Sequence, residues 1–369
     1  MASFTKRGST WQYTVSRMVD GKSKPIRKGG FRTKKEASIA AAEVEADLRK
    51  GIIPNLKKIA LEDYFEEWLK VYKSKAARTT TERYTYSLKT IQSYFKGKAI
   101  QDISKRDYQI FLNEYARTHA KETIRKLNTH IRACVREAID EGIIRIDFTR
   151  DIKVTSDVVT KRPEEKHLSY EESKQLLNEI YKRLDRSLAY YVILLALTSG
   201  MRFGEIVGLT REDFDFKTNK ISINKTWDYK TGKGFEKTKN DPSIRTIKMD
   251  SRTMDLFKEL FQKTPNNIHN LAFYSPNSAN KVVTNEFTNR VLKKMLKHLN
   301  ITTPLTIHGL RHTHASVLLY RKISIYYVSE RLGHANIDTT LKHYAHVVKE
   351  LREEDTDNTI KTFEQMIGV

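Results

Sequence analysis

The chain has 369 residues, enough for two or three domains, and its 39% hydrophobic and 30% charged residues are typical of a globular protein. Its 67 Lys and Arg outnumber 45 acidic residues, so the net charge of +22 favours a polyanionic partner, because neutralised phosphates release counterions. The single cysteine, Cys134, excludes an intrachain disulfide, and the longest apolar run, 188–197, is too short to span a membrane. We therefore expect a reducing, cytoplasmic location and no membrane partner. A basic protein without any nucleic-acid role is the alternative interpretation of the charge.

The first expected domain, residues 1–55, combines a small three-stranded sheet with one helix. Strand-like segments with glycine turns at Asp20-Gly21 and Gly29-Gly30 precede a helical segment that Thr33 caps and Gly51 ends. Ten Lys or Arg against one acid in residues 1–35 suit a module that grips phosphates or reads a DNA groove. The alternative is a solvated basic face over a core formed by the aromatic residues Trp11, Tyr13 and Phe31.

The second expected domain, residues 57–155, is an all-α bundle. Four segments show helical spacing, with starts near Thr79 and Ser104 and a stop at Asp140-Glu141-Gly142. Cys134 lies in one of these helical patterns and is expected to be a small core residue. A linker is expected at 157–165, where Pro163 disfavours helix just before it.

The third expected domain, residues 165–369, is mainly helical with a few strands. Ser169 and Glu172 form a capping-box pattern at its first helix, and a hydrophobic helix at 188–198 stops at Gly200. Residues 220–230 and 243–249 alternate like strands, and the chain from 283 onward is helical. The fold class is therefore mostly α with small β elements (α+β).

The segment TSGMRFGEIVGL places Arg202 just after the end of that hydrophobic helix. Arg202 and Glu205 are three residues apart and share a helical face. An arginine at a helix N-terminus opposes the helix dipole, which makes sense if an anion binds there. A simple surface Arg–Glu pair is the alternative.

The segment IHGLRHTHAS places His308 and Arg311 on one helical face. The fork of an arginine matches two phosphate oxygens, and a neighbouring histidine can transfer protons near neutral pH. His308 and His312 also have the i, i+4 spacing of a zinc-binding helix, but Gly309 stands where that motif needs glutamate. Capping or core side chains are the second alternative.

The segment LGHANIDTTLKHYAHV adds His334 after a Leu-Gly turn and Tyr344 on a following helix that residues 338–340 could start. A single tyrosine among 18 is usually a core or surface residue. Tyr344 draws attention through the histidines and arginines that precede it.

Taken in order, these motifs resemble the catalytic unit of tyrosine recombinases of the phage-integrase type. R-x-x-E follows a glycine turn, a lysine lies in a β-hairpin, and H-x-x-R, L-G-H and a tyrosine ten residues later complete the series. The resemblance spans about 167–350. It implies an arm-type DNA-binding domain at 1–55, a helical core-binding domain at 57–155 and a catalytic domain with a C-terminal tail at 165–369, as in integrases of phages and conjugative elements.

The resemblance also implies a role for each matching residue. Tyr344 matches the nucleophile, Arg202 and Arg311 the arginines that hold the scissile phosphate, and Glu205 the acid that supports the first arginine. His308 matches the histidine of H-x-x-R, a candidate base, and His334 the histidine that contacts a phosphate oxygen. The catalytic lysine, a candidate acid for the leaving oxygen, is expected to be Lys237, with Lys239 as the alternative because it points to the same strand face.

The resemblance implies an enzyme that cuts and rejoins DNA through a 3′-phosphotyrosyl intermediate, without metal, ATP or other cofactor. Expected partners are double-stranded DNA at core-type and arm-type sites, three further copies in a homotetramer, and an excisionase and a host DNA-bending protein. The tail residues Ile360, Phe363, Met366 and Ile367 share one helical side and suit packing on a neighbouring copy, with packing on their own domain as the alternative. The alternative functions are an Xer-like resolvase and a non-catalytic DNA-binding regulator.

Overall fold

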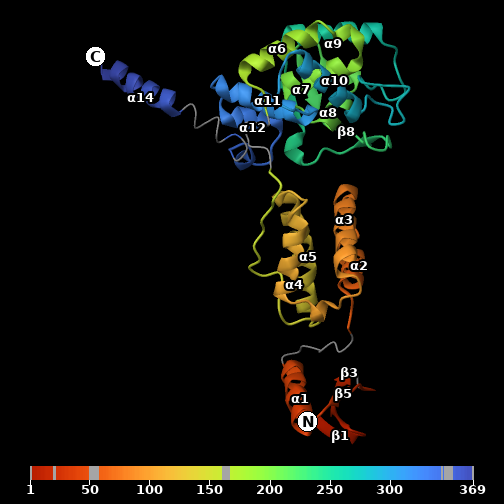
Figure 1. Cartoon of the computed structure of the whole chain (residues 1–369). Coiled ribbons are helices and arrows are strands. Elements are labelled where there is room, and N and C mark those ends of the chain that lie inside the picture. Colours follow the sequence, from red (N-terminus) through yellow and green to blue (C-terminus); the bar gives the residue numbers. More distant parts are fainter. Residues whose placement is uncertain are drawn as a thin grey trace. The chain divides into compact units, whose positions relative to one another are not determined.

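The computed structural model describes residues 2–19, 22–49, 58–159, 167–341, 344 and 352–367. The chain divides into two compact units, Met1–Thr160 and Lys161–Val369. Helices predominate and the sheets are small and antiparallel, which confirms the fold class predicted from the sequence (Figure 1). Within the described residues, no helix is both long and apolar enough to cross a membrane.

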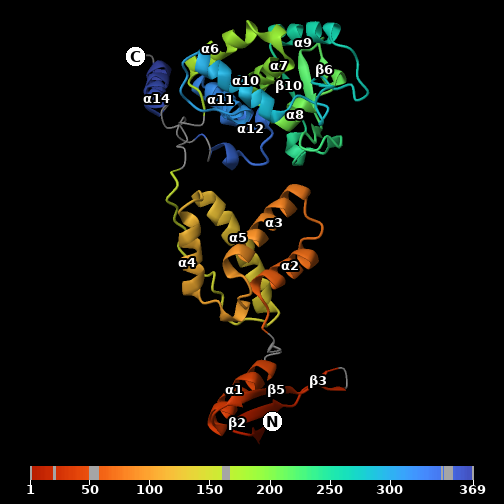
Figure 2. The ribbon, with the colours of Figure 1, turned by 45° about the vertical axis from the view of Figure 1, so that its right-hand side comes forward.

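A three-stranded sheet begins the first unit, and one helix packs on it (Figure 2). The sheet order is β1-β2-β5, with both pairs antiparallel. Tyr13 and Val15 on β2 are buried against Ala41 and Val44 of the helix, because alternate strand residues face the same side. The elements are β1 (Ala2–Arg7), β2 (Thr10–Val15), β3 (Met18–Val19), β4 (Lys22–Ser23), β5 (Ile26–Phe31) and α1 (Lys34–Arg49).

The predicted glycine turn at Gly29-Gly30 was wrong. Both glycines lie inside β5, where the pairing with β2 is irregular between Trp11 and Tyr13. Gly30 has φ +92°, a conformation that glycine adopts without steric cost, so here it supports a strand irregularity instead of a turn. Thr33 caps α1 as predicted, since its hydroxyl accepts a hydrogen bond from the Glu36 amide at 3.1 Å. Asp20, Gly21 and Gly51 lie outside the described residues.

A four-helix bundle forms the rest of the first unit, as predicted. Its core contains Trp68, Phe65, Ile91 and Phe111, and the predicted core residue Cys134 is fully buried. The elements are α2 (Leu61–Tyr72), α3 (Arg78–Phe95), the 3₁₀ turn η1 (Ile100–Asp102), α4 (Lys105–Ala116) and α5 (Lys121–Asp140).

The caps of these helices follow the sequence with one exception. Ser104 caps α4 in a capping box with Asp107, and α5 ends at Asp140. The predicted start at Thr79 was wrong, because α3 already begins at Arg78 and Ala77 is its N-cap. Most of the predicted linker, 160–165, lies outside the described residues.

The second unit surrounds one apolar helix, α7, whose neighbours are α6, α8, α10 and α11. Ten of the twelve residues of α7 are buried, which explains why its sequence is apolar all round. Its elements are α6 (Tyr170–Tyr181), η3 (Leu184–Arg186), α7 (Leu188–Ser199), α8 (Phe203–Val207), η4 (Arg211–Asp213), β6 (Phe214–Asp215), β7 (Lys220–Ile223), β8 (Thr226–Trp227), β9 (Phe235–Glu236), η5 (Asp241–Ser243), β10 (Arg245–Lys248), α9 (Ser251–Lys263), α10 (Asn285–His298), α11 (Ile307–Tyr320), α12 (Ile325–Leu332) and α14 (Arg352–Ile367).

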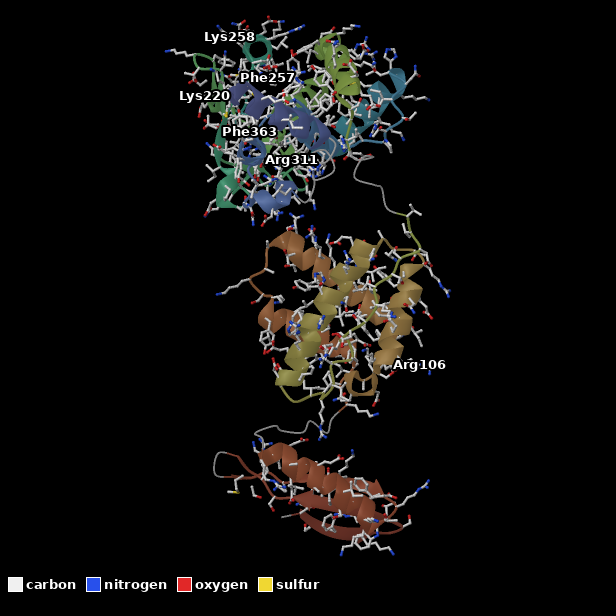
Figure 3. All side chains as sticks on the ribbon, turned by 90° about the vertical axis from the view of Figure 1, so that its left-hand side faces the viewer. Arg106, Lys220, Phe257, Lys258, Arg311 and Phe363 are labelled. Carbon is white, nitrogen blue, oxygen red and sulfur yellow. The ribbon has the colours of Figure 1, made fainter. Side chains whose placement is uncertain are left out.

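Amphipathic helices and short strands cover this central helix. On α9, Phe257 is fully buried while the next residue, Lys258, is exposed (Figure 3). Ser169 caps α6 in the predicted capping box with Glu172. The strands predicted at 220–230 and 243–249 are confirmed as β7, β8 and β10. Strands β10 and β7 belong to an antiparallel sheet in the order β10-β7-β6, and β8 pairs with β9 in a separate hairpin.

Candidate active site

A tight turn between α7 and α8 positions the first predicted arginine. Gly200 ends α7 with φ +69°, and a Cβ there would lie 2.7 Å from both His314 Cδ2 and Leu332 Cδ2. Only glycine combines this left-handed conformation with such close neighbours. Two residues after Gly200, Arg202 is the N-cap of α8, at the helix start that the sequence predicted.

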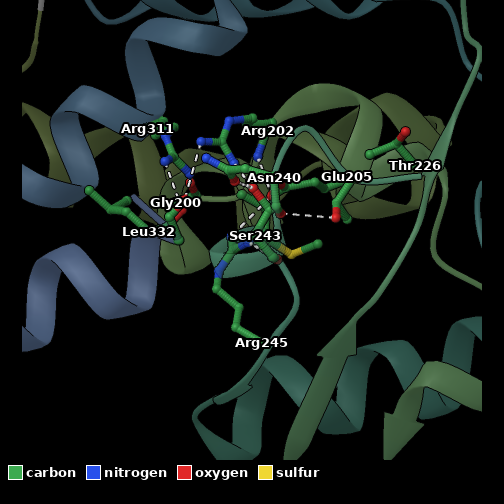
Figure 4. Close-up of polar contacts among 12 residues, drawn as sticks. Gly200, Arg202, Glu205, Thr226, Asn240, Ser243, Arg245, Arg311 and Leu332 are labelled. Carbon is green, nitrogen blue, oxygen red and sulfur yellow. Dashed lines mark hydrogen bonds and ion pairs between the residues drawn. The ribbon is translucent and has the colours of Figure 1, made fainter. Parts of the chain in front are cut away.

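Glu205 joins two arginines at the centre of the site (Figure 4). Its carboxylate is 1% exposed, and its Oε1 accepts from Arg202 Nη1 at 2.7 Å. Its Oε2 accepts from Arg245 Nη2 and from the Arg202 amide, both at 3.0 Å. Burial alone would raise the pKa of this carboxyl, but the charges and hydrogen bonds of Arg245 and Arg202 outweigh it and hold the pKa below its usual value. Glu205 is therefore a charged buried support for Arg202.

Arg245 is a member of the site that the sequence analysis missed. It lies on β10, and its side chain is 6% exposed. Besides Glu205, it donates to the carbonyls of Arg331 at 2.7 Å and Ser243 at 2.9 Å. Burial is the main cause that lowers the pKa of this guanidinium, although Glu205 opposes the shift. The available signal was a charged residue in an alternating strand pattern, which does not distinguish a buried arginine from an exposed one.

Arg311 is held by main-chain carbonyls on the other side of the Gly200 turn. Its Nη1 donates to Gly200 O at 2.6 Å and its Nη2 to Leu332 O at 2.7 Å (Figure 4). Burial, followed by repulsion from Arg202, lowers the pKa of this guanidinium to about 9, so it still carries its charge at neutral pH. A guanidinium has five N–H groups, and these two carbonyls use two of them. Arg311 is therefore held at both Nη atoms by main-chain carbonyls.

His314 and Arg331 contact each other beside these arginines, and the Arg331 carbonyl accepts from Arg245. Neither residue was predicted from the sequence to belong to the site. His314 is buried, and its Nδ1 lies 2.9 Å from Leu197 O. Its Nε2 accepts from Arg331 Nε at 3.2 Å, which requires a neutral ring with the hydrogen on Nδ1. Burial and the charge of Arg331 lower the pKa of this histidine to about 3, so the ring stays neutral. These contacts tie α11 and α12 to the end of α7.

Tyr344 is buried, and its hydroxyl contacts a histidine. Tyr344 Oη lies 2.8 Å from Nδ1 of His312, which the sequence analysis considered only as a metal ligand. The ring of His308, the predicted base, is exposed and lies edge-on to His312 with 5.3 Å between the ring centres. Burial raises the pKa of Tyr344, although Arg311 opposes the shift. The i, i+4 spacing of the two histidines was visible in the sequence, but not which of them reaches the tyrosine.

His334 follows Gly333, the left-handed C-cap of α12, as the predicted Leu-Gly turn requires. Its Nδ1 lies 2.7 Å from the hydroxyl of Thr340, on the helical segment 337–341. Gly333 O accepts from Arg202 Nη2 at 3.4 Å. The turn that carries His334 thus also contacts the first arginine.

The lysine candidates lie beyond the β8-β9 hairpin. Both Lys237 and Lys239 are exposed, and β9 ends at Glu236, so the expectation that both lie on one strand face was wrong. The carbonyl of Lys237 accepts a hydrogen bond from the Thr226 hydroxyl at 3.5 Å, which fixes its backbone beside β8. The choice between the two lysines stays a prediction.

The second unit thus collects three guanidinium groups around one carboxylate. Arg245 and Arg311 are buried, whereas the side chain of Arg202 is 26% exposed and reaches the solvent side of the cluster. The excess of positive charge in a partly dry site suits an anion with several oxygens, such as a phosphodiester. Among the described residues, no group of three or more His, Cys, Asp or Glu could hold a metal ion.

Three family profiles match successive parts of the chain. The profile described as "Phage integrase family" matches residues 166–350, half of the chain, and includes all of the side chains described above. The chain belongs to the phage integrase family. In this integrase-family chain, an "Arm DNA-binding domain" profile matches residues 3–48, and a "Phage integrase, N-terminal SAM-like domain" profile matches residues 60–116. The family expected from the sequence is confirmed.

Curated relatives resemble the chain over most of its length. A "Tyrosine recombinase XerC-like" protein of Caldanaerobacter subterraneus is 28% identical, over 94% of this chain and 95% of the relative. The integrase of Staphylococcus phage L54a is 27% identical, over 81% of this chain and 92% of the relative. The ICEBs1 integrase of Bacillus subtilis is 24% identical, over 90% of this chain and 93% of the relative.

Solved structures share the fold. An integrase of transposon Tn1549, in complex with a circular intermediate DNA, has a TM-score of 0.67 at 20% identity and covers 80% of this chain and 99% of that chain. A lambda integrase tetramer bound to a Holliday junction has a TM-score of 0.57 at 16% identity, with coverages of 88% and 89%. The two fold likenesses agree with the family assignment.

Proposed function

We propose that this protein is a site-specific DNA recombinase that integrates and excises a mobile element, with Tyr344 as its nucleophile. One observation carries the proposal: two arginines, Arg202 and Arg311, are fixed on either side of the Gly200 turn in the same cluster as the buried hydroxyl of Tyr344. The enzyme class follows from the family, and the relatives named as integrases of a phage and of ICEBs1 support a mobile element as the target.

The reaction exchanges one phosphodiester for another. Tyr344 Oη attacks the scissile phosphorus, the bond to the 5′-oxygen breaks, and the DNA 3′-phosphate becomes esterified to the tyrosine. The phenolic proton leaves Oη, and the departing 5′-oxygen gains a proton. Because the new ester retains the bond energy, a different 5′-hydroxyl can reverse the step and join new partners without ATP.

The arginines stabilise the charge that develops in this reaction. The transition state carries extra negative charge on the non-bridging oxygens, and fixed donors need no reorganisation at that moment. Removing one such donor typically costs about 10²–10³ in rate. Glu205 and Gly200 O contribute by holding Arg202 and Arg311 in place.

Three further side chains complete the proposed site. His308 is proposed to assist proton removal, and His334 to donate a hydrogen bond to a phosphate oxygen. Lys237, with Lys239 as the alternative, is proposed to protonate the leaving 5′-oxygen. The exposure of His308, Lys237 and Lys239 supports these roles, and so does the contact between Arg202 and the turn that carries the half-buried His334.

The chain before the catalytic part is proposed to bind DNA in two modules. Residues 1–55 would contact arm-type sites and residues 57–155 core-type sites, with catalysis in residues 165–369. The arm and SAM-like family profiles and the excess of basic residues support this division. Because its substrate would be intracellular DNA, the protein is proposed to act in the cytoplasm.

The active assembly is proposed to be a homotetramer on two DNA sites, and the solved structure of a lambda integrase tetramer bound to a Holliday junction supports the tetramer. In α14, Ile360, Phe363 and Met366 are exposed in the single chain, which suits packing against a neighbouring copy. An excisionase and a host DNA-bending protein are proposed to control the direction of recombination.

A suicide substrate tests the proposal. DNA nicked near the crossover loses the short 5′-fragment after cleavage and traps the covalent adduct, which is scored after denaturation in the presence of EDTA. Wild type and the control variant Tyr326→Phe, an exposed tyrosine on α12, are expected to form the adduct, and Tyr344→Phe is not. An adduct with Tyr344→Phe would refute the nucleophile. No adduct on DNA that wild type binds specifically would favour a non-catalytic regulator.

An Xer-like resolvase is the second candidate, because the relative of Caldanaerobacter subterraneus is named "Tyrosine recombinase XerC-like" and matches nearly the whole chain. The two functions share their chemistry and differ in the DNA they join. A resolvase converts plasmid dimers that carry two identical sites into monomers, whereas an integrase joins two different attachment sites. The two functions are distinguished by assaying joined attachment sites on DNA with the element's own ends, and resolved monomers on a plasmid with two identical sites.

A further inference from the structure

One face of α11 lies beside Tyr344. His308, His312, Ala315 and Leu319 are spaced i, i+4, i+7 and i+11, so they form one stripe of the helix. Tyr344 packs with Ala315 and Leu319 of this stripe. The ring of His312 lies next along it, with 5.8 Å between its centre and that of the tyrosine ring. His312 is thus placed by the same helical geometry that buries the nucleophile.

The contact between the two side chains allows the tyrosine hydroxyl to donate to the histidine. Burial raises the pKa of Tyr344, so at neutral pH the phenol keeps its proton and can donate it. The partner at 2.8 Å is Nδ1 of His312, which accepts only in the tautomer that carries its hydrogen on Nε2. The distance is that of a strong O–H···N hydrogen bond. A buried phenol with its hydroxyl directed at an imidazole nitrogen is the arrangement of a nucleophile and its base.

We propose that His312 is a further catalytic residue, whose Nδ1 takes the phenolic proton as Tyr344 Oη attacks the scissile phosphorus. In this step the O–H bond of Tyr344 breaks, an N–H bond forms on His312, and the ring becomes an imidazolium. The P–O bond to Tyr344 forms as the bond to the 5′-oxygen breaks, and that oxygen takes its proton from a separate acid. In religation the imidazolium returns its proton to the departing phenolate. This inference rests on the proposed role of Tyr344.

The positions of the two histidines separate their tasks. His312 is half-buried and contacts the reacting oxygen, whereas His308 is exposed and one turn away on the same stripe. The two rings pack edge-on, and His308 lies on the solvent side. We therefore assign direct acceptance of the tyrosine proton to His312, and the assisting role in proton removal to His308.

The test compares His312→Asn with wild type in single-turnover cleavage of the suicide substrate at saturating protein. The asparagine oxygen can occupy the place of Nδ1 and accept a hydrogen bond, but it cannot hold the proton. We expect cleavage to slow by about 10²–10⁴-fold, the usual contribution of general base catalysis, with DNA affinity and melting temperature unchanged. His312→Gln serves as a second variant if His312→Asn is unstable.

A difluorotyrosine at position 344 separates base catalysis from positioning. Its phenol is more acidic and needs less help in losing its proton. We therefore expect difluorotyrosine to raise the cleavage rate of His312→Asn at least tenfold, and to change the cleavage rate of the wild type little. A bridging 5′-sulfur in the DNA, which leaves without an acid, is expected not to restore that variant. A loss below tenfold, no rescue by difluorotyrosine, or rescue by the 5′-sulfur would overturn the inference. An adduct with Tyr344→Phe would instead overturn the proposed function itself.

Discussion

Replacing Glu205 with glutamine is expected to destabilise the catalytic unit by about 3–5 kcal/mol, the usual cost of removing one member of a buried ion pair. The structure places this substitution in that class because Glu205 is 1% exposed and its partner Arg245 is 6% exposed. Glutamine keeps the shape but leaves Arg202 and Arg245 without their shared carboxylate. For a unit of about 200 residues, each kcal/mol changes the melting temperature by roughly 2–4 °C, so we expect a decrease of about 6–20 °C.

Differential scanning calorimetry of the full chain measures this decrease, with Glu286→Gln as the matched control. Glu286 pairs with Arg290 at 3.5 Å, but both side chains are exposed, so that change is expected to cost only about 0–1 kcal/mol. Because the pKa of Glu205 is lowered in the folded state, its stabilisation is present above the unfolded pKa of about 4.3 and is lost as the pH falls through the folded value. A decrease no larger than that of the control, between pH 5 and 8, would refute the reasoning.

Three further predictions concern other parts of the site. Gly200→Ala is expected to lose at least about 1 kcal/mol in urea unfolding and most adduct formation, because its Cβ would meet His314; unchanged stability would contradict the strained turn. Of Lys237→Ala and Lys239→Ala, only the variant that lacks the acid is expected to be restored by a bridging 5′-sulfur, and restoration of both or neither would contradict a single acid. Phe363→Ser is expected to weaken tetramer formation on DNA in cross-linking without changing the melting temperature, and a lower melting temperature would indicate packing within one chain.

Local rules of sequence predicted much of the secondary structure. Ser104 and Ser169 cap their helices as their capping boxes require, and Gly200 ends α7 in the left-handed conformation. These features depend on neighbouring residues only. The errors at Gly29-Gly30 and Thr79 arose where tertiary pairing or the preceding turn decided the outcome, since a glycine pair fits a bulged strand as well as a turn.

Those residues of the site whose type and order along the chain indicate their chemistry could be predicted from the sequence. The sequence pointed to Arg202, Glu205 and Arg311, and the structure brings all three into one cluster. It could not identify Arg245, because burial of an arginine on a short strand depends on a carboxylate 40 residues away. Nor could it select His312 over His308, since that choice depends on where Tyr344 lies along α11.

The arginines of this site are held to a large extent by the peptide backbone. The carbonyls of Gly200, Leu332 and Gly333 receive Arg311 and Arg202, and those of Arg331 and Ser243 receive Arg245. Main-chain acceptors remain in place when side chains are exchanged, provided that the local turn is kept. For directed evolution toward new target sequences, libraries can therefore vary other side chains around the cluster, as long as Glu205 and the glycines at 200 and 333 remain fixed.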